Sequence, residues 1–222
     1  MDKDFSIDDA LGYGWDCMKN NLKFFIPAVL LMWVAAGIPS GLQSASSFLN
    51  WKVAIVFGTV FGLVSFVVGI FISIAGVKIG LGFVDGRPGD LSDLYNGYPL
   101  FWKMLGTWIL YMLLVLAGLI LLIVPGIYWA VRYRFSMYAV VDEGLGPVEA
   151  MKRSGQLTRG VWWHLAFFYL AMVGINMLGS CLCLVGLLFA VPVVIVAEAY
   201  VFRSLKGQLA VGTKPVPPQP AA

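Results

Sequence analysis

The sequence predicts an all-α protein, a polytopic transmembrane helical bundle, and three observations support that prediction. Of its 222 residues 60% are hydrophobic and 12% are charged, and the mean hydropathy is +0.85. Soluble domains carry about 25% charged residues, so this chain has roughly half the charge that covers a water-facing surface. The 15 Phe, 9 Tyr and 8 Trp exclude a disordered chain, because disordered chains are poor in large apolar side chains. The third observation is a series of long apolar stretches.

Six apolar stretches predict membrane-spanning helices, because a hydrocarbon core about 30 Å thick needs about 20 mostly apolar residues. They are 24–42, 53–78, 104–124, 126–141, 161–179 and 184–202. The fourth is short, and Val124-Pro125-Gly126 separates it from the third. Proline and glycine favour a tight reversal there, and hence a helical hairpin rather than one very long helix. Residues 1–206 therefore form one membrane domain, and the proline-rich residues 207–222 form a flexible cytoplasmic tail.

The basic residues of the connections predict an orientation with both termini in the cytoplasm. In that orientation Lys52 alone lies outside, and cytoplasmic connections are the ones rich in Lys and Arg. Twelve basic residues then lie inside: Lys3, Lys19, Lys23, Lys78, Arg87, Lys103, Lys152, Arg153, Arg159, Arg203, Lys206 and Lys214. The start of the chain has no basic run before a short apolar core, so no cleavable signal peptide is expected.

An internal repeat precedes the predicted hairpins. In three segments that align without gaps, an acid is followed ten residues later by a base: Asp9 with Lys19, Asp93 with Lys103, and Glu149 with Arg159. In the first segment the apolar residues recur at intervals of three and four, which predicts an amphipathic helix lying along the membrane surface. The sequence thus predicts three parallel repeats, each an interfacial helix followed by a transmembrane hairpin.

The second predicted span carries a stripe of small residues. They are Gly58, Gly62, Ser65, Gly69, Ser73, Gly76 and Gly80. Lipid gives helices no hydrophobic reason to associate, so small residues serve to bring two backbones close together. We expect this helix to be the most buried one and a leucine at Gly69 to disrupt the fold. The alternatives are a pore lining and self-association into a dimer.

Four polar residues inside the predicted spans form a candidate intramembrane cluster. They are Arg132, Arg134, Asn176 and Glu198, and ionisable side chains within hydrocarbon are costly and by default functional. At about 1.5 Å of rise per residue, Glu198 and Arg134 lie at similar depths. We expect Glu198 to pair with Arg134 or Arg132 and so to join the second hairpin to the third. The alternative is that these residues line a substrate or proton path.

The sequence carries no motif typical of an enzyme. One histidine, His164, and the closely spaced Cys181 and Cys183 do not supply the ligands of an ordinary metal site. No phosphate-binding glycine loop or nucleophile elbow is present. Basic residues are dispersed over short loops, which argues against nucleic-acid binding. We therefore expect no enzymatic activity, no cofactor and no metal.

One stretch resembles a known signature. It comprises Val124-Pro125-Gly126-Ile127, Arg132, Phe135, Val141-Asp142-Glu143-Gly144, Pro147, Glu149-Ala150, Ser154, Leu157-Thr158 and Gly160. This stretch resembles uncharacterised bacterial inner-membrane proteins of the UPF0259 and DUF975 types, and the membrane domain that accompanies some glycerophosphodiester phosphodiesterases. The resemblance implies a six-helix bundle in the bacterial cytoplasmic membrane. It implies no activity, because the phosphodiesterase chemistry belongs to a separate soluble domain.

Within that stretch, the cytoplasmic link between the second and third hairpins is the candidate working motif. Its residues are Asp142, Glu149, Ser154, Thr158 and Gly160. We expect a non-enzymatic envelope accessory or scaffold, with membrane lipids, other membrane proteins or further copies of itself as partners. The alternative is a small-solute transporter or channel with a polar site around Arg132, Asn176 and Glu198. A polar cavity around these three residues favours transport, and a tightly packed bundle favours the scaffold.

Overall fold

The computed structural model describes residues 5–46, 48, 50–87, 97–181 and 183–211, and every regular element in this part is helical. The elements are α1 (Ile7–Asn20), α2 (Leu22–Ser46), α3 (Trp51–Val84), the short 3₁₀ helix η2 (Tyr98–Leu100), α4 (Phe101–Leu121), α5 (Ile123–Arg132), α6 (Ser136–Glu143), α7 (Pro147–Leu157), α8 (Trp162–Cys181) and α9 (Cys183–Val211). The predicted all-α class is confirmed.

Five helices of the described residues are long and apolar enough to cross a membrane. They are Leu22–Ala45, Trp51–Val84, Tyr98–Leu121, Trp162–Cys181 and Gly186–Leu209. They coincide with the first, second, third, fifth and sixth predicted spans, and they indicate a multi-pass membrane protein. The last helix continues to Val211, so the predicted start of the flexible tail at residue 207 is wrong for 207–211. Residues 212–222 lie outside the described part.

The fourth predicted span, 126–141, is not one helix. Helix α5 ends at Arg132, and α6 begins at Ser136 after a turn. In that turn the Ser136 N–H bonds to the Tyr133 carbonyl at 3.1 Å. The Arg132 carbonyl instead accepts hydroxyl hydrogen bonds from Ser154 of α7 (2.8 Å) and from Thr158, directly after α7 (3.2 Å). The helix breaks here because side chains from another element satisfy the carbonyl that a continuous helix would use.

The reversal before α5 also differs from the prediction. It occurs at Leu122, whose backbone is extended with φ −169° and ψ 151°. Pro125 and Gly126 therefore lie in the first turns of α5, where a proline fits because its missing N–H has no partner to lose. Gly126 packs so closely on Gly118 of α4 that a Cβ on Gly118 would lie 2.8 Å from the Gly126 Cα. A helical hairpin forms as predicted, with its turn displaced by two residues.

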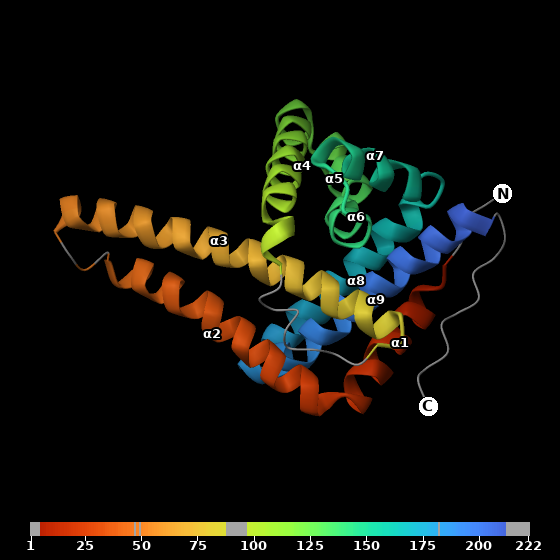
Figure 1. The fold of residues 1–222 in the computed structure, drawn as a ribbon, viewed down its shortest axis with the longest axis horizontal. Coiled ribbons are helices and arrows are strands. Elements are labelled where there is room, and N and C mark those ends of the chain that lie inside the picture. The colour runs from red at the N-terminus through yellow and green to blue at the C-terminus, as the bar shows by residue number, and fades with distance from the viewer. Residues whose placement is uncertain (1–4, 47, 49, 88–96, 182, 212–222) are drawn as a thin grey trace.

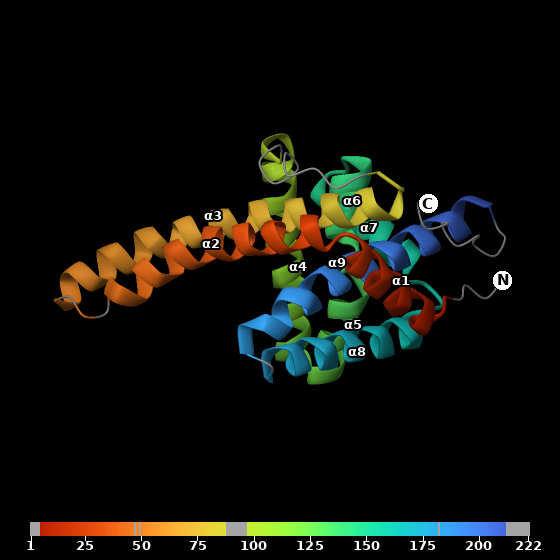
Figure 2. The same ribbon diagram turned by 90° about the horizontal axis from the view of Figure 1, so that it is seen from below.

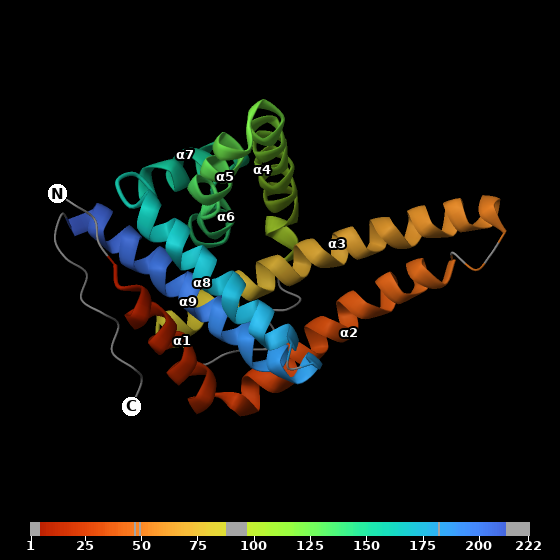
Figure 3. The same cartoon turned by 180° about the vertical axis from the view of Figure 1, so that it is seen from behind.

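The helices are arranged around α9. Helices α2 and α3 form a long hairpin whose far end extends away from the remaining helices, whereas α4 crosses α3 near its middle (Figures 1 and 2). Helix α8 lies beside α9, and α1 packs on the opposite side of α9 (Figure 3). A Cβ on Gly14 of α1 would lie 2.7 Å from the Val193 carbonyl oxygen. Of the five long apolar helices, α9 is the most buried.

The stripe of small residues on α3 has two different surroundings. Gly76 and Gly80 face α9, and a Cβ on Gly80 would lie 2.8 Å from the Ile195 carbonyl oxygen. Gly69 and Ser73 are exposed, and nothing lies within 4 Å of a Cβ placed on Gly69. The prediction that α3 is the most buried helix is therefore wrong, because only the second half of α3 reaches α9. The expectation that a leucine at Gly69 disrupts the fold loses the helix contact on which it rested and stays a prediction.

Amphipathic helices form at two of the three predicted positions. Helix α1 begins as expected, with the Ser6 hydroxyl accepting the Asp9 N–H at 3.1 Å, and α7 begins at Pro147. The segment around Asp93 lies outside the described residues. The parallel threefold repetition stays a prediction.

Candidate functional site

The first part of the candidate site is a buried ion pair. Glu198 on α9 is 5% exposed. Its Oε1 accepts the Arg134 Nε–H at 2.9 Å and the Tyr169 hydroxyl at 3.1 Å. Arg134 lies in the turn between α5 and α6, and Tyr169 lies on α8. Of the two arginines considered for Glu198, the structure pairs Arg134, and the pair joins the second hairpin to the third.

Arg132 and Asn176 do not belong to this cluster. The Arg132 guanidinium lies over the rings of Tyr128 (5.5 Å) and Tyr133 (6.0 Å) and donates to the Tyr128 hydroxyl. Asn176 donates from Nδ2 to the Met172 carbonyl of its own helix at 2.9 Å. The predicted four-residue cluster is thus corrected to Arg134 and Glu198, with Tyr169 as a partner that the sequence did not indicate.

Most of the candidate cytoplasmic motif builds backbone structure. Ser154 and Thr158 are buried and hold the Arg132 carbonyl. The Glu149 carboxylate accepts the Gly146 N–H at 3.2 Å, which caps the start of α7. Gly160 has φ +89°, a conformation that favours glycine, and it ends the turn before α8. These four residues have structural roles that their spacing in the sequence does not reveal.

Asp142, the fifth motif residue, belongs to an ionic network at one end of the molecule. Its Oδ1 lies 2.8 Å from the Arg203 NH2, and its Oδ2 accepts from the Lys206 Nζ. Burial of the Asp142 carboxyl opposes ionisation, but the hydrogen bonds from Lys206 and Arg203 outweigh it and lower the pKa below its ordinary value of 3.8. The ionic network comprises Arg87, Asp85, Arg203, Asp142, Lys206, Glu143 and Arg153.

Two further contacts make this network the meeting point of four helices. Arg203 of α9 bonds to both Asp85 oxygens, at 2.8 and 2.7 Å, at the end of α3. Glu143 at the end of α6 lies 2.9 Å from Lys206 and 3.2 Å from Arg153 of α7. Asp85, Glu143, Arg203 and Lys206 were not among the predicted site residues. The available signal was that acids lie in the connections after the second and fourth spans, and bases follow the sixth.

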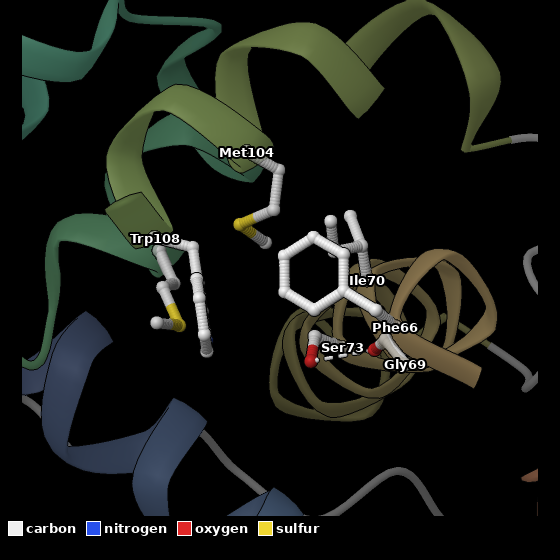
Figure 4. A pocket seen from close by; sticks show the side chains of 7 residues that line it. Phe66, Gly69, Ile70, Ser73, Met104 and Trp108 are labelled. Atoms are coloured by element: carbon white, nitrogen blue, oxygen red, sulfur yellow. Dashed lines mark hydrogen bonds between the residues drawn. The ribbon is translucent and has the colours of Figure 1, made fainter. Parts of the chain in front are cut away.

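The Arg134–Glu198 pair stands in the wall of a cavity of about 310 Å³. Apolar side chains from α2, α3 and α9 form most of the remaining wall, among them Val29, Ile72 and Ile195. A second cavity of about 220 Å³ lies between α3 and α4 and shares Ser73 and Met137 with the first. Figure 4 shows Met104 and Trp108 of α4 facing Phe66, Ile70 and Ser73 of α3 across this cavity. Arg132 and Asn176 line neither cavity.

No metal centre is found in the part of the chain that the structure describes. No group of three or more His, Cys, Asp or Glu residues there is placed to hold a metal ion. The two cysteines whose side chains are described, Cys17 and Cys181, are free thiols. The site is therefore an ion pair beside an apolar cavity, together with a surface ionic network.

The fold and site define a multi-pass, all-helical membrane protein with a charged end, and known proteins of bacteria are similar to it. The chain is 25% identical, over an alignment 238 positions long, to an uncharacterized protein of Mycobacterium bovis and to uncharacterized proteins of two Mycobacterium tuberculosis strains. Each alignment covers 96% of this chain and 73% of the relative. No family model matches the chain, and no solved structure matches it. The resemblance to the UPF0259 and DUF975 types stays a prediction.

Proposed function

We propose that this chain is a non-enzymatic protein of the bacterial cytoplasmic membrane that acts as a scaffold, with its working surface in the cytoplasm. The observation that carries the proposal is how the charged and motif side chains are used. The ionic network joins the ends of α3, α6 and α9 to α7, and the motif hydroxyls hold a backbone carbonyl. Such contacts build one rigid layer, which suits the presentation of a fixed surface to partners.

The same network supports a six-span topology with α5 and α6 together as a broken fourth span. Asp85 follows the second crossing, Asp142 the fourth and Arg203 the sixth, and Arg203 contacts both carboxylates. Each crossing takes the chain to the opposite side of the membrane. The ends of three crossings can therefore lie on the same side only if the chain crosses an even number of times between one end and the next. Because this side is rich in Lys and Arg, we place it, and both termini, in the cytoplasm.

Cysteine labelling tests the topology. In a variant without native cysteines, we place one cysteine at Asn50, in the connection of α2 and α3, or at Val148, on α7. In intact right-side-out cells an impermeant maleimide is expected to label the Asn50→Cys protein. The Val148→Cys protein is expected to react only after permeabilisation, since its side chain is 57% exposed but lies inside. The reverse pattern contradicts the proposed orientation.

Photo-crosslinking tests the scaffold. A photoreactive side chain at Val148 is expected to capture the same one or few proteins in repeated preparations. The matched control is Ile120, which is 84% exposed at the far end of α4 and is expected to capture lipid. Equal protein capture at both positions, or none at Val148, contradicts a cytoplasmic scaffold surface.

A small-solute transporter is the second candidate, and the cavity beside Arg134 and Glu198 favours it. Paired charges within a membrane often mark a transport path. The test is solute uptake into liposomes that contain the purified protein. Uptake that an Arg134→Met, Glu198→Gln double variant abolishes favours transport over the scaffold.

A further inference from the structure

We propose that the two adjoining cavities bind one anionic diacyl phospholipid, of the phosphatidylglycerol class, with its phosphodiester on the Arg134 guanidinium. This inference rests on the proposed function, since it needs the cavities to open into a membrane. It assigns a ligand to the two cavities, which the ion pair by itself does not explain.

The charge arrangement favours an anion at this position. Of the three guanidinium nitrogens of Arg134, only Nε has a hydrogen-bond partner among the described residues. That partner is the Glu198 Oε1, at 2.9 Å. The Arg134 side chain is 44% exposed, whereas its Glu198 partner is 7% exposed. Both side chains line the larger cavity, and the arginine is the more exposed member of the pair. The two terminal nitrogens of a guanidinium form a fork that matches two phosphate oxygens.

The walls favour acyl chains. Apart from the ion pair, the larger cavity is lined mostly by apolar side chains, such as Met32, Val77 and Ile195. The Ser73 hydroxyl offers a ligand no free donor, because it already donates to the Gly69 carbonyl at 3.0 Å. An apolar hollow that stayed empty would forfeit the dispersion contacts of its lining atoms. A flexible hydrocarbon chain from the surrounding membrane restores them.

The two cavities meet at Ser73 and Met137, which line both. Their volumes are about 310 and 220 Å³, and Arg134 lines the larger one. Two adjoining apolar cavities, one of them lined by an arginine, suit a charged headgroup with two chains. Gly69 and Ser73 lie on the α3 side of the smaller cavity, opposite Met104 and Trp108 (Figure 4). The part of the small-residue stripe that contacts no other helix thus leaves room for the ligand.

Native mass spectrometry of the intact protein in mild detergent tests the inference. The protein is offered equal amounts of phosphatidylglycerol, phosphatidylcholine and diacylglycerol with identical chains. We expect phosphatidylglycerol to be retained about tenfold more than diacylglycerol, the usual effect of a hydrogen bond to a charged group. Phosphatidylcholine is expected to fall between them, because its cationic headgroup opposes the arginine.

Two variants separate the headgroup site from the chain site. Arg134→Met with Glu198→Gln removes both charges, keeps an acceptor for the Tyr169 hydroxyl, and is expected to abolish the preference for phosphatidylglycerol. Ser73→Trp fills the junction of the two cavities and is expected to lower retention of all three lipids. Thr59→Trp is its control: Thr59 is exposed on the same helix, donates to the Ile55 carbonyl at 2.7 Å, and lines neither cavity.

Three results overturn the inference. They are equal retention of phosphatidylglycerol and diacylglycerol by the parent, equal retention of phosphatidylglycerol and phosphatidylcholine, and equal lipid retention by the Ser73→Trp and Thr59→Trp proteins. Extraction of the membranes with alkaline carbonate keeps this failure distinct from a failure of the proposed function. A chain that resists extraction but shows no lipid preference contradicts the lipid site alone, whereas a chain that is extracted contradicts both.

Discussion

The two halves of α3 are equally apolar but have opposite surroundings. In residues 51–69 large side chains such as Ile55, Val56 and Leu63 are about 60% exposed. In residues 70–84 Ile74, Ile79 and Leu81 are at most 3% exposed, because this half packs on α9, α6 and α4. Hydropathy therefore reports that a helix needs an apolar environment. It does not report whether protein or lipid supplies that environment.

The difference extends beyond α3. The half that packs on α9 ends beside the ionic network at Asp85, and α1 lies against the neighbouring part of α9. The other half contacts α2 and leads to exposed residues such as Trp51. One end of the molecule is thus held by protein contacts and charges. We expect substitutions there to be costly and matched substitutions at the other end to be nearly silent.

The largest expected effect is the loss of one member of the buried ion pair. Arg134→Ala leaves the Glu198 carboxylate buried without its cation, and we expect the free energy of unfolding to fall by about 3 kcal/mol. Unfolding in mixed detergent and SDS micelles measures it. The control from the exposed half is Leu63→Ala, at a side chain 61% exposed, with an expected change near zero. A cost for Leu63→Ala as large as that for Arg134→Ala contradicts the comparison.

A methyl group added to each half of α3 gives the next largest effect. At Gly80 an alanine Cβ would lie 2.8 Å from the Ile195 carbonyl oxygen, so the two helices must separate, at a cost of about 2 kcal/mol. At Gly69 nothing lies within 4 Å of the added Cβ, and the better helix propensity of alanine leaves stability unchanged or slightly higher. The thermal unfolding midpoints of Gly80→Ala and Gly69→Ala proteins check this. Similar midpoints for the two variants contradict the packing described for α3.

The sequence predicts the long helices of this fold but not how they pack. Long apolar stretches predict five of the long helices, because span length and hydropathy are local properties. The break at Arg132 was not predictable from its neighbours, since the hydroxyls that cause it belong to Ser154 and Thr158, on and directly after another helix. The small-residue stripe was misread for a similar reason. Which part of a stripe meets a helix depends on where that helix lies.

The candidate site shows the same limit. Depth along each helix placed Glu198 near Arg134, and the structure has this pair. Asn176 was grouped with them as a polar residue inside a span, but its amide donates to the Met172 carbonyl of its own helix. The ionic network escaped prediction because Asp85 and Arg203 are 118 residues apart, and their contact depends on three hairpins ending at one level.

A smaller effect is expected from acid at the ionic network. The pKa of folded Asp142 lies below its ordinary value of 3.8, so its ionised form stabilises the folded state above that pH. This contribution is lost as the pH falls from 3.8 through the lower folded pKa. We expect about 1 kcal/mol, because the partners are partly exposed to solvent.

Asp142→Asn is the variant that checks this acid effect. The thermal unfolding midpoint of the parent is expected to fall more steeply below pH 3.8 than that of Asp142→Asn. The midpoint of Asp142→Asn is expected to be lower already at neutral pH. Parallel curves for the two proteins contradict a role of this carboxylate in stability.

The smallest effect concerns reactivity rather than stability, and it compares a thiol in the protein-packed end with an exposed thiol at the end of α8. Cys17 on α1 is half-buried against the core, and burial raises its pKa to about 11. Cys181 is exposed at the end of α8. Because maleimides react with the thiolate, we expect Cys181 to be labelled at least roughly tenfold faster than Cys17 near neutral pH in a Cys183→Ser protein.

The control is the same labelling in SDS, where the two rates should converge. Raising the pH toward the pKa of Cys17 should accelerate its labelling only in part, because the packing of α1 on α9 also limits access of the reagent. A Cys17 thiol that reacts as fast as Cys181 in the folded protein would mean that α1 leaves α9 often. The protein-packed end would then lack the rigidity that separates it from the outer half of α3.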